Sequence, residues 1–351
     1  MTYNAFQFGT TDSYLTPIAL GAMVFGTRTP EDEARRILDH FSSVVTPRFT
    51  APDGAPARGM IDTADCYSWW DERGSYGGHS EAVLGRWFAD SGSRDSVFLS
   101  TKGTALMDDI DAVWNGDQQA HWSVVATHFV GAAPQVLRDS LAASLERLGV
   151  EHIDLYYNHV DDRRTPLVDA VGTFASFVAD GRIGAYGWSN APTWRLAQIR
   201  DIAEQNGWPQ PAAFQQEHSY LRRRAGLRHT SITSDEQLDY LATYPDLQLV
   251  AYSPVTKGLF SDRSRRSAGF ANLAPFAGPD ADARLAAVDR VAAATGATGN
   301  QVVLAWMMAS SAPRVLPLIG PRTWEQYTEC IEALDLDLMI DQLAELDAAG
   351  A

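Results

Sequence analysis

The chain has 351 residues, of which 45% are hydrophobic, and a formal net charge of −16. This charge argues against binding to nucleic acids or anionic membrane surfaces, because both require basic patches. Cys66 and Cys330, the only cysteines, can build neither a disulfide framework nor a cysteine-based metal site. Neither an export signal nor an apolar run of membrane-spanning length is visible, so we expect a cytoplasmic protein.

Short apolar runs alternate with segments of helical periodicity along the chain. The runs are bounded by turn residues and are rich in β-branched or aromatic residues, which is typical of buried parallel strands. In chain order, strands are predicted over 16–20, 59–62, 96–101, 152–157, 183–188, 212–215, 247–252 and 314–318. Helices are predicted over 30–42, 79–90, 133–148, 166–180, 192–206, 233–243, 299–310 and 323–333. Such a series predicts a closed parallel barrel or a doubly wound sheet.

Two features favour the barrel. No Gly-x-Gly-x-x-Gly motif follows a predicted strand, so the fingerprint of an open dinucleotide-binding sheet is missing. Polar residues also follow several different strands, where a barrel places its chemistry. We therefore predict an α/β protein, a single-domain (β/α)8 TIM barrel over residues 1–351. Long connections, which commonly serve as binding loops, are expected on its C-terminal face over 44–58, 68–79, 103–128 and 253–280.

Four polar side chains follow successive predicted strands: Asp62 and Tyr67 the second, Lys102 the third and His159 the fourth. Carbonyl reduction by hydride places negative charge on oxygen, so a proton donor is required. A free tyrosine has a pKa of about 10, and we expect the Lys102 ammonium to lower the pKa of Tyr67 toward neutrality. Asp62 would hold Lys102, and His159 would orient the carbonyl. Each residue alone could be structural, and Asp62 with Lys102 could be a plain salt bridge; the conjunction favours catalysis.

Ten segments carry a resemblance to a known family. They are LGAMVFGT, IDTADCY, SEAVLGRW, VFLSTKG, LAASLERLGVEHIDLYYNH, DGRIGAYGWSN, FQQEHSYL, VAYSPVTKGL, NQVVLAWMM and PLIGPRTWEQYTE. Together they resemble the aldo-keto reductase superfamily from about Leu15 to Leu346. The resemblance implies an oxidoreductase that moves a hydride between a nicotinamide and a small-molecule carbonyl or alcohol.

The resemblance also implies site residues. Asp62, Tyr67, Lys102 and His159 would form a catalytic tetrad, with Tyr67 as acid in reduction and base in oxidation. Ser189, Asn190 and Gln215 would bind the nicotinamide carboxamide, and Tyr252 would stack on its ring. The other implied cofactor contacts are Gly21, Met23, Asp62, Ser253, Pro254, Val255, Lys257, Gly258, Leu259, Ile319, Gly320, Pro321, Arg322, Gln326, Glu329 and Cys330.

Two implied contacts bear on the choice of cofactor. Arg322 and Lys257 would supply cations to the cofactor phosphates, and a guanidinium donates two parallel hydrogen bonds to a phosphate. We therefore expect NADP(H) rather than NAD(H), although Arg322 and Lys257 could each be merely solvated. The sequence departs from the family at Cys330, where an asparagine is usual, which weakens this preference, and at Ile319, where a proline is common.

Aromatic residues indicate the substrate site. Phe25, Trp69, Trp70 and His159 are predicted to contact the substrate, and stacked tryptophans favour an aromatic ring or the apolar face of a sugar. Further candidates for the pocket wall are Trp114, Trp122, Trp188 and Tyr220, although Trp188 could be barrel packing.

Two alternatives to this function remain, and a separate prediction concerns metals. The chain could be a regulatory nicotinamide-binding protein, as are the beta subunits of potassium channels, which resemble the same superfamily. It could instead be a lyase or isomerase that uses Lys102 as a Schiff-base amine. We predict no metal site, because no His-Glu-x-x-His motif is present and His121 and His128 lack a clear third ligand. No oligomeric state is predicted.

Overall fold

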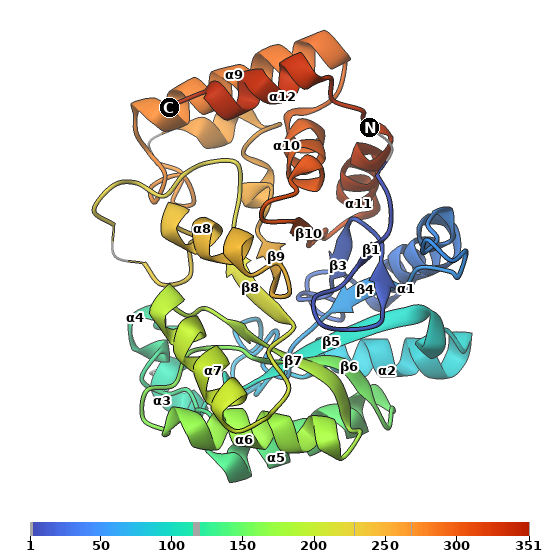
Figure 1. Ribbon diagram of the computed structural model, residues 1–351, viewed down its shortest axis with the longest axis vertical. Coiled ribbons are helices and arrows are strands. Elements are labelled where there is room, and N and C mark those ends of the chain that lie inside the picture. The colour runs from blue at the N-terminus through green and yellow to red at the C-terminus, as the bar shows by residue number, and fades with distance from the viewer. Residues whose placement is uncertain (1–2, 115–119, 228, 268, 351) are drawn as a thin grey trace.

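Eight parallel strands close into a barrel in the computed structural model, which describes residues 3–114, 120–227, 229–267 and 269–350 (Figure 1). The last strand pairs with the first, since Leu318 lies opposite Ala19. In barrel order the strands are β3 (Ala19–Gly21), β4 (Gly59–Asp62), β5 (Val97–Gly103), β6 (Ile153–Asn158), β7 (Ile183–Ser189), β8 (Ala213–Glu217), β9 (Gln248–Tyr252) and β10 (Val315–Ile319). The predicted (β/α)8 TIM barrel is confirmed; that residues 1–351 form one domain stays a prediction.

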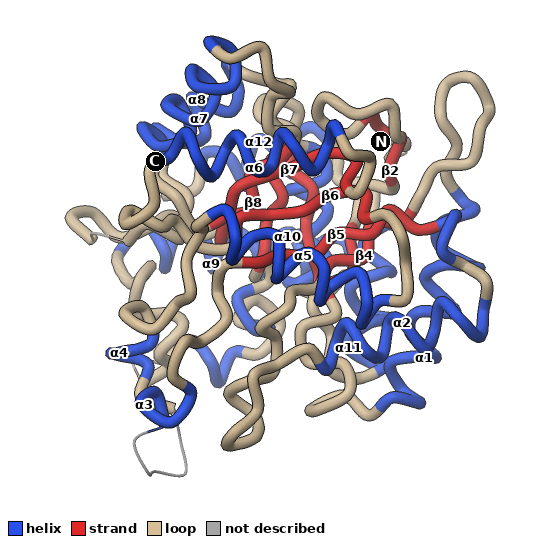
Figure 2. Tube along the Cα trace, turned by 90° about the horizontal axis from the view of Figure 1, so that it is seen from below, coloured by secondary structure: helices blue, strands red, loops and turns tan. Residues whose placement is uncertain are grey.

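Helices surround the strands (Figure 2). The predicted helices are present as α1 (Glu31–His40), α2 (His79–Ser91), α5 (Pro134–Leu148), α6 (Leu167–Ala179), α7 (Thr193–Gln205), α8 (Asp235–Thr243), α10 (Gly299–Ala309) and α11 (Trp324–Ile331). Four further helices were not predicted: α3 (Ile110–Trp114), α4 (Trp122–Val125), α9 (Pro279–Thr295) and α12 (Ile340–Ala348). Within the described residues, none of the helices is both long and apolar enough to cross a bilayer.

The strands are buried on both faces, because side chains alternate between the barrel interior and the surrounding helices. Met60, Phe98 and Leu155 belong to a cluster inside the barrel. Their neighbours Ile61 and Leu99 belong to the larger core between strands and helices. The near-continuous apolar runs in the sequence reflect this double burial.

An antiparallel hairpin of β1 (Phe6–Gln7) and β2 (Tyr14–Leu15) covers the N-terminal end of the barrel. Phe6, Phe8 and Leu15 pack with the apolar side chains of the barrel interior. The ring of Phe8 lies 5.1 Å from that of Phe98. The hairpin therefore closes the N-terminal end of the barrel. The polar side chains that follow the strands lie at the opposite, C-terminal end.

The structure corrects the placement of one long connection. Residues 44–58 lie at the hairpin end, since the Arg58 amide donates to Tyr14 O at 2.9 Å. The reason is chain order: this segment leads from a helix into a strand, whereas only strand-to-helix connections emerge at the C-terminal end. The connections 68–79, 103–128 and 253–280 do follow strands, and α3 and α4 lie in the second of them, in which 115–119 are outside the described residues. Figure 2 shows α3 and α4 at the end opposite β2.

Candidate active site

A buried ion pair joins Asp62, at the end of β4, to Lys102 on β5. Ser100 and Lys102 lie two residues apart on β5, so both side chains point to the same face of the strand and both reach Asp62. Ser100 Oγ donates to Asp62 Oδ2 at 2.7 Å, and Gln215 Nε2 donates to the same oxygen at 3.0 Å. Lys102 Nζ donates to Asp62 Oδ1. The carboxylate is therefore held from three sides in a site that solvent does not reach.

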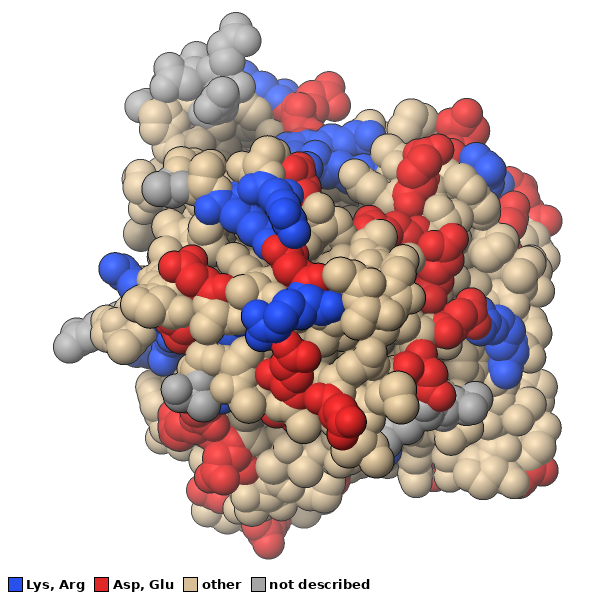
Figure 3. Space-filling model, turned by 90° about the horizontal axis from the view of Figure 1, so that it is seen from above, with Lys and Arg blue, Asp and Glu red and all other residues tan. Residues whose placement is uncertain are grey.

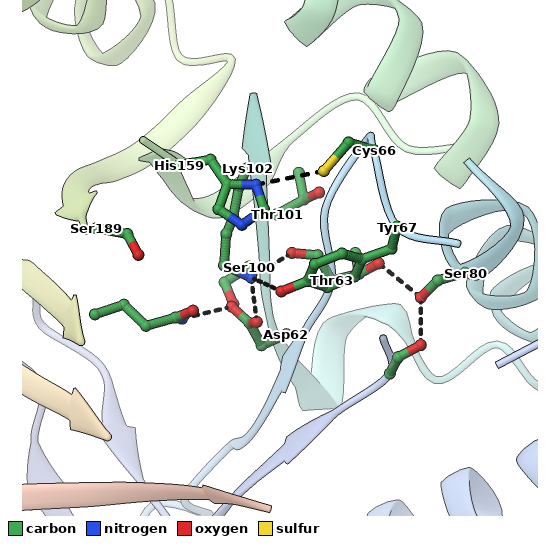
Figure 4. A network of polar contacts seen from close by, with 12 residues as sticks. Asp62, Thr63, Cys66, Tyr67, Ser80, Ser100, Thr101, Lys102, His159 and Ser189 are labelled. Carbon is green, nitrogen blue, oxygen red and sulfur yellow. Dashed lines mark hydrogen bonds and ion pairs between the residues drawn. The ribbon is translucent and has the colours of Figure 1, made fainter. Parts of the chain in front are cut away.

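The Lys102 ammonium connects this pair to Tyr67. Lys102 Nζ donates to Tyr67 Oη at 2.9 Å and to Thr63 O at 2.7 Å (Figure 4). With the bond to Asp62, these contacts use all three ammonium protons. Tyr67 lies in the turn directly after β4, so the same strand end supplies the carboxylate and the phenol.

His159 completes the group from the end of β6. Its ring centre lies 5.7 Å from that of Tyr67, nearly edge-on, and its Nδ1 lies 3.6 Å from Cys66 Sγ. Burial, with the Lys102 charge in addition, lowers the pKa of His159 well below its ordinary value. The imidazole is therefore neutral at neutral pH and has one N–H to donate. The structure thus brings together all four predicted tetrad side chains.

The acidity of Tyr67 differs from the prediction. Burial raises the pKa of Tyr67 well above its ordinary value, and the Asp62 carboxylate raises it further. The predicted lowering by Lys102 is wrong for this structure, because the desolvation of the partly buried phenol outweighs the attraction of one ammonium whose charge is already paired. Tyr67 therefore keeps its proton at neutral pH, which is the form that a proton donor requires.

The predicted carboxamide-binding residues lie beside this group, at the ends of β7, β8 and β9. Ser189 is in register with Gln215. Asn190 Nδ2 donates to Ser189 Oγ at 3.0 Å and to His159 O at 2.9 Å, and Tyr252 Oη donates to Asn190 Oδ1 at 2.8 Å. These contacts tie the predicted nicotinamide contacts to the backbone of His159.

Three cations converge near the predicted pyrophosphate loop. Partial burial and the positive charges of Arg322 and Arg28 lower the pKa of Lys257. Arg28 pairs with Asp71, but neither Lys257 nor Arg322 forms an ion pair with any residue in the described ranges. Like charges that lie together without enough carboxylates favour an anionic ligand. A phosphate-bearing dinucleotide fits this arrangement.

The backbone of the same loop, its buried Thr256 and the neighbouring Asn300 of α10 also fit such a ligand. Ser253, Thr256 and Lys257 have positive φ angles of 54°, 44° and 55°, a region that residues other than glycine seldom adopt. The buried Thr256 Oγ1 and Asn300 Oδ1 accept or donate no hydrogen bond within the described residues. Strained backbone and orphaned polar atoms together are typical of a ligand-binding loop.

The remaining predicted cofactor contacts fall into two groups. Met23 and Gly320 are exposed, Gly21 is in register with Asp62, and Pro254, Val255 and Gly258 belong to the loop just described. Gln326 Oε1 accepts from the Arg322 amide at 2.9 Å, and Glu329 accepts from Ser261 Oγ at 2.8 Å, which holds the loop against α11. In contrast, the side chains that pack into the main core are Leu259, Ile319 and Cys330.

Comparison with known proteins settles the family. The model of the Aldo/keto reductase family matches residues 17–351. The chain belongs to the aldo/keto reductase family. This aldo/keto reductase is 30% identical over 335 residues to the uncharacterized oxidoreductase YrpG of Bacillus subtilis, with 94% of this chain and 90% of that protein covered.

Two fungal relatives extend the comparison. Norsolorinic acid reductase B of Aspergillus parasiticus is 26% identical over 343 residues, covering 95% of this chain and 81% of that protein. Aldo-keto reductase ausK of Emericella nidulans is 26% identical over 353 residues, covering 96% and 78%. The family and these relatives identify the chain as an oxidoreductase, and the resemblance drawn from the sequence motifs is confirmed.

Tryptophans of two loops form one edge of the site in this reductase. Trp70 lies 6.2 Å from the Tyr67 ring, 5.8 Å from Trp69 and 6.0 Å from Trp122, measured between ring centres. Trp122 is 62% exposed, whereas Trp69 and Trp114 are buried within the loop cluster. Trp70 and Trp122 are therefore the indoles that a ligand beside Tyr67 would meet.

Three other aromatic candidates point elsewhere. Phe25 has no exposed surface and packs in the main core, which leaves it no face for a ligand in this conformation. Trp188 faces the helices, 5.4 Å from Phe174 on α6. Tyr220 donates to Leu346 O at 2.6 Å and packs on Trp306, so it joins the β8 loop to the C-terminal helices. Trp188 and Tyr220 are therefore packing residues and do not line the substrate site beside Tyr67.

Sequence reasoning missed three contributors to the site. Ser100 holds Asp62, Cys66 touches His159, and Arg28 adds the third cation near Lys257. The two-residue spacing of Ser100 and Lys102 was a readable signal, because it places both side chains on one face of a strand. Cys66 and Arg28 gave no comparable signal. In the described ranges, no group of three histidine, cysteine or acidic side chains is placed to hold a metal ion.

Proposed function

We propose that this chain is an NADP(H)-dependent reductase that interconverts a carbonyl and an alcohol, with Tyr67 as the general acid and base. One observation carries the proposal: the hydroxyl of the partly buried Tyr67 lies 2.9 Å from Lys102 Nζ, which is itself paired with Asp62. A protonated phenol beside a fixed ammonium is suited to give a proton to a developing alkoxide.

Each residue of the tetrad has a separate role in the proposed reaction. A bound nicotinamide would supply the hydride. Tyr67 Oη gives its proton to the carbonyl oxygen, and Lys102 stabilises the phenolate that remains. Asp62 keeps Lys102 charged and in position, while the neutral His159 donates an N–H to the same carbonyl oxygen. In alcohol oxidation the phenolate takes the proton back.

The cofactor assignment depends on the cation group and on the polar cluster beside it. Arg322, Lys257 and Arg28 would neutralise the cofactor phosphates, and Arg322 is suited to a 2′-phosphate because its planar guanidinium can bind two oxygens. Ser189, Asn190 and Gln215 would hold the carboxamide, with Tyr252 against the ring. NADP(H) is therefore preferred to NAD(H).

The alternatives have less support. A Schiff-base enzyme needs a lysine with a free lone pair, but Lys102 donates all three ammonium protons to Asp62, Thr63 and Tyr67. A regulatory protein without turnover needs no proton donor, so the contact between Tyr67 and Lys102 would have no purpose. Neither alternative is favoured by a separate feature of the site.

We infer an aromatic aldehyde or ketone as the first substrate class to test. The exposed Trp122 and the neighbouring Trp70 give a planar substrate two indole faces near Tyr67. A sugar, whose apolar face also stacks on indole, is the second class to test. Four of the relatives are named as reductases of norsolorinic acid.

Replacing the phenol tests the proposal directly. Tyr67→Phe should lower turnover of aromatic aldehydes by about a thousandfold, the usual size of a lost general acid, while NADPH affinity stays near that of the wild type. Turnover is measured by the loss of NADPH absorbance and affinity by fluorescence titration. The matched control is Tyr244→Phe, which alters an exposed phenol at the end of α8. An unchanged rate in Tyr67→Phe would remove the residue from its role.

The cofactor assignment has its own test. Arg322→Ala should weaken NADPH binding at least tenfold, about 1.4 kcal/mol, and leave NADH binding nearly unchanged, because only NADPH carries the 2′-phosphate. Arg290→Ala, which removes an exposed arginine of α9 that pairs with Glu345, serves as control. Equal weakening of both cofactors would contradict the assignment.

A further inference from the structure

A cavity of about 450 Å³ lies outside the barrel, between the loop that follows β8 and the helices α8, α9, α10 and α12. Its walls include residues 218–226 of that loop, Arg284 of α9, Trp306 of α10 and Asp347 of α12. None of its lining residues belongs to the tetrad or to the predicted cofactor contacts. In Figure 1 these helices lie in the upper half of the molecule, with α9 and α12 side by side at the top.

Arg284 lines this cavity and is 3% exposed. Its Nη1 donates to Tyr220 O at 3.0 Å, and its guanidinium carbon lies 4.8 Å from the centre of the Tyr220 ring. Its buried Nε has no hydrogen-bond partner, and no carboxylate among the described residues forms an ion pair with it. Asp235 and Asp280 attract Arg284 only from beyond ion-pair distance. A buried cation without a direct ion pair is costly, so an anion bound beside it would stabilise this site.

His218 is a second buried polar residue of the same wall, 8% exposed. Burial lowers its pKa to about 4, so the ring is neutral at neutral pH. Its backbone amide donates to Tyr252 O, but its ring forms no hydrogen bond with any residue that the structure describes. A neutral imidazole retains one N–H donor. Two enclosed donors therefore border the same space.

The lining of the cavity carries an excess of positive charge. Arg222, Arg223 and Arg224 line it together with Arg284, whereas Asp235 and Asp347 are its only acidic residues among those described. Four arginines against two aspartates leave an excess of two positive charges, in a chain whose net charge is −16. Asp347 already accepts from Trp306 Nε1 at 2.7 Å. Figure 3, which looks onto the face of α9 and α12, shows how basic groups gather in patches between acidic ones.

We propose that this cavity is a second ligand site, which binds a small organic oxyanion carrying two or more negative charges. Arg284 and His218 bind the anion inside the cavity, and the exposed Arg222 and Arg224 attract it at the mouth. Guanidinium groups suit phosphate and carboxylate alike, because both accept two parallel hydrogen bonds. Trp306 and Leu238 give the carbon part of the ligand an apolar wall.

Calorimetric titration with pyrophosphate and, separately, with citrate tests this site without any measurement of turnover. The wild-type chain should bind at least one of them with a dissociation constant below about 1 mM, and the better probe identifies the anion as phosphate or carboxylate. Arg284→Met should abolish the binding at this cavity, measured in the Arg322→Ala background so that anion binding at the proposed cofactor loop does not contribute. The double variant Arg222→Ala/Arg224→Ala changes only exposed side chains and should weaken the binding at this cavity about tenfold, so it decides the case even if Arg284→Met does not fold.

Arg322→Ala separates this site from the proposed cofactor site: it weakens any anion binding at the cofactor loop and should keep the binding at this cavity. Binding that is lost in Arg322→Ala and kept in the double variant would place the anion at the cofactor loop and overturn the proposal. Failure of the wild type to bind either probe would also overturn it. Neither result would bear on the role of Tyr67.

Discussion

Asp62 and Asp65 are three residues apart and each is 1% exposed, yet their surroundings are opposite. Asp62 accepts hydrogen bonds from Ser100, Gln215 and the Lys102 ammonium. Neither carboxyl oxygen of Asp65 accepts a hydrogen bond of acceptable geometry within the described residues. Burial, and then the charge of Glu81, raises the pKa of Asp65 well above its ordinary value, which favours the neutral acid. Partners, and not burial alone, therefore decide which buried acid carries a charge.

The alternation of side chains along β5 separates the two environments. Ser100 and Lys102 point into the barrel and reach Asp62, whereas Thr101 between them points outward and donates to Glu81 at 2.6 Å. Glu81 of α2 also pairs with Arg147 at 2.7 Å. One strand thus serves a charged site on its inner face and a second acidic cluster on its outer face.

The largest effect is expected when the partnered acid loses its charge. Asp62→Asn places an amide NH2 against donors and leaves the buried Lys102 ammonium without a counter-charge, so the free energy of unfolding should fall by about 3–5 kcal/mol. Turnover should fall with it, because Lys102 is no longer held beside Tyr67. Urea denaturation and the NADPH assay measure the two effects. A fall of less than about 1 kcal/mol would contradict the expectation that this buried ion pair contributes strongly to the free energy of unfolding.

A smaller effect is expected when only one donor to Asp62 is removed. Ser100→Ala deletes a hydrogen bond to a carboxylate and should lower the free energy of unfolding by about 1.5 kcal/mol, with a measurable loss of turnover. Thr101→Val is the matched change on the outer face of β5, where it removes the bond to Glu81. It should lower stability similarly and leave turnover unchanged. Equal losses of turnover in both variants would show that the two faces are not independent.

The smallest effect is expected at the acid without partners. Asp65→Asn has nearly the same shape and should change the free energy of unfolding by less than about 1 kcal/mol near pH 5. Above the ordinary carboxyl pKa the folded wild type binds more protons than the unfolded chain, so its stability falls as the pH rises. The variant lacks this loss, and its stability relative to the wild type should increase between about pH 5 and 8. A constant difference in urea denaturation over that range would show that Asp65 is ionised when folded.

Much of the fold could be predicted from the sequence, because strands buried on both faces give long apolar runs and helices give a different period. The hairpin of β1 and β2 was missed because strands of two residues carry no period. The helix α9 was missed because its buried side includes the charged Arg284 and the small Ala281 and Ala287, which weaken the apolar period. The predicted position of residues 44–58 was wrong, although the sequence would have allowed the right one. A helix-to-strand connection lies at the N-terminal end of a barrel, and this segment joins a helix to a strand.

The proximity of Tyr67, Lys102, Asp62 and His159 could be predicted from strand order, because the C-terminal ends of all strands meet on one rim. The pKa of Tyr67 could not, since it depends on how completely the loops enclose the phenol. Alternation could have excluded Trp188 from the pocket, because its neighbour Ser189 faces the site.

The hairpin that seals the barrel also constrains how ligands come and go. Phe6, Phe8 and Leu15 pack with Met60 and Phe98 and fill this end of the barrel, so ligands can reach the tetrad only from the C-terminal rim. Cofactor and substrate would therefore approach the tetrad from the same side. The one that lies deeper has to bind first and leave last. We expect an ordered kinetic scheme, with the cofactor as the first to enter.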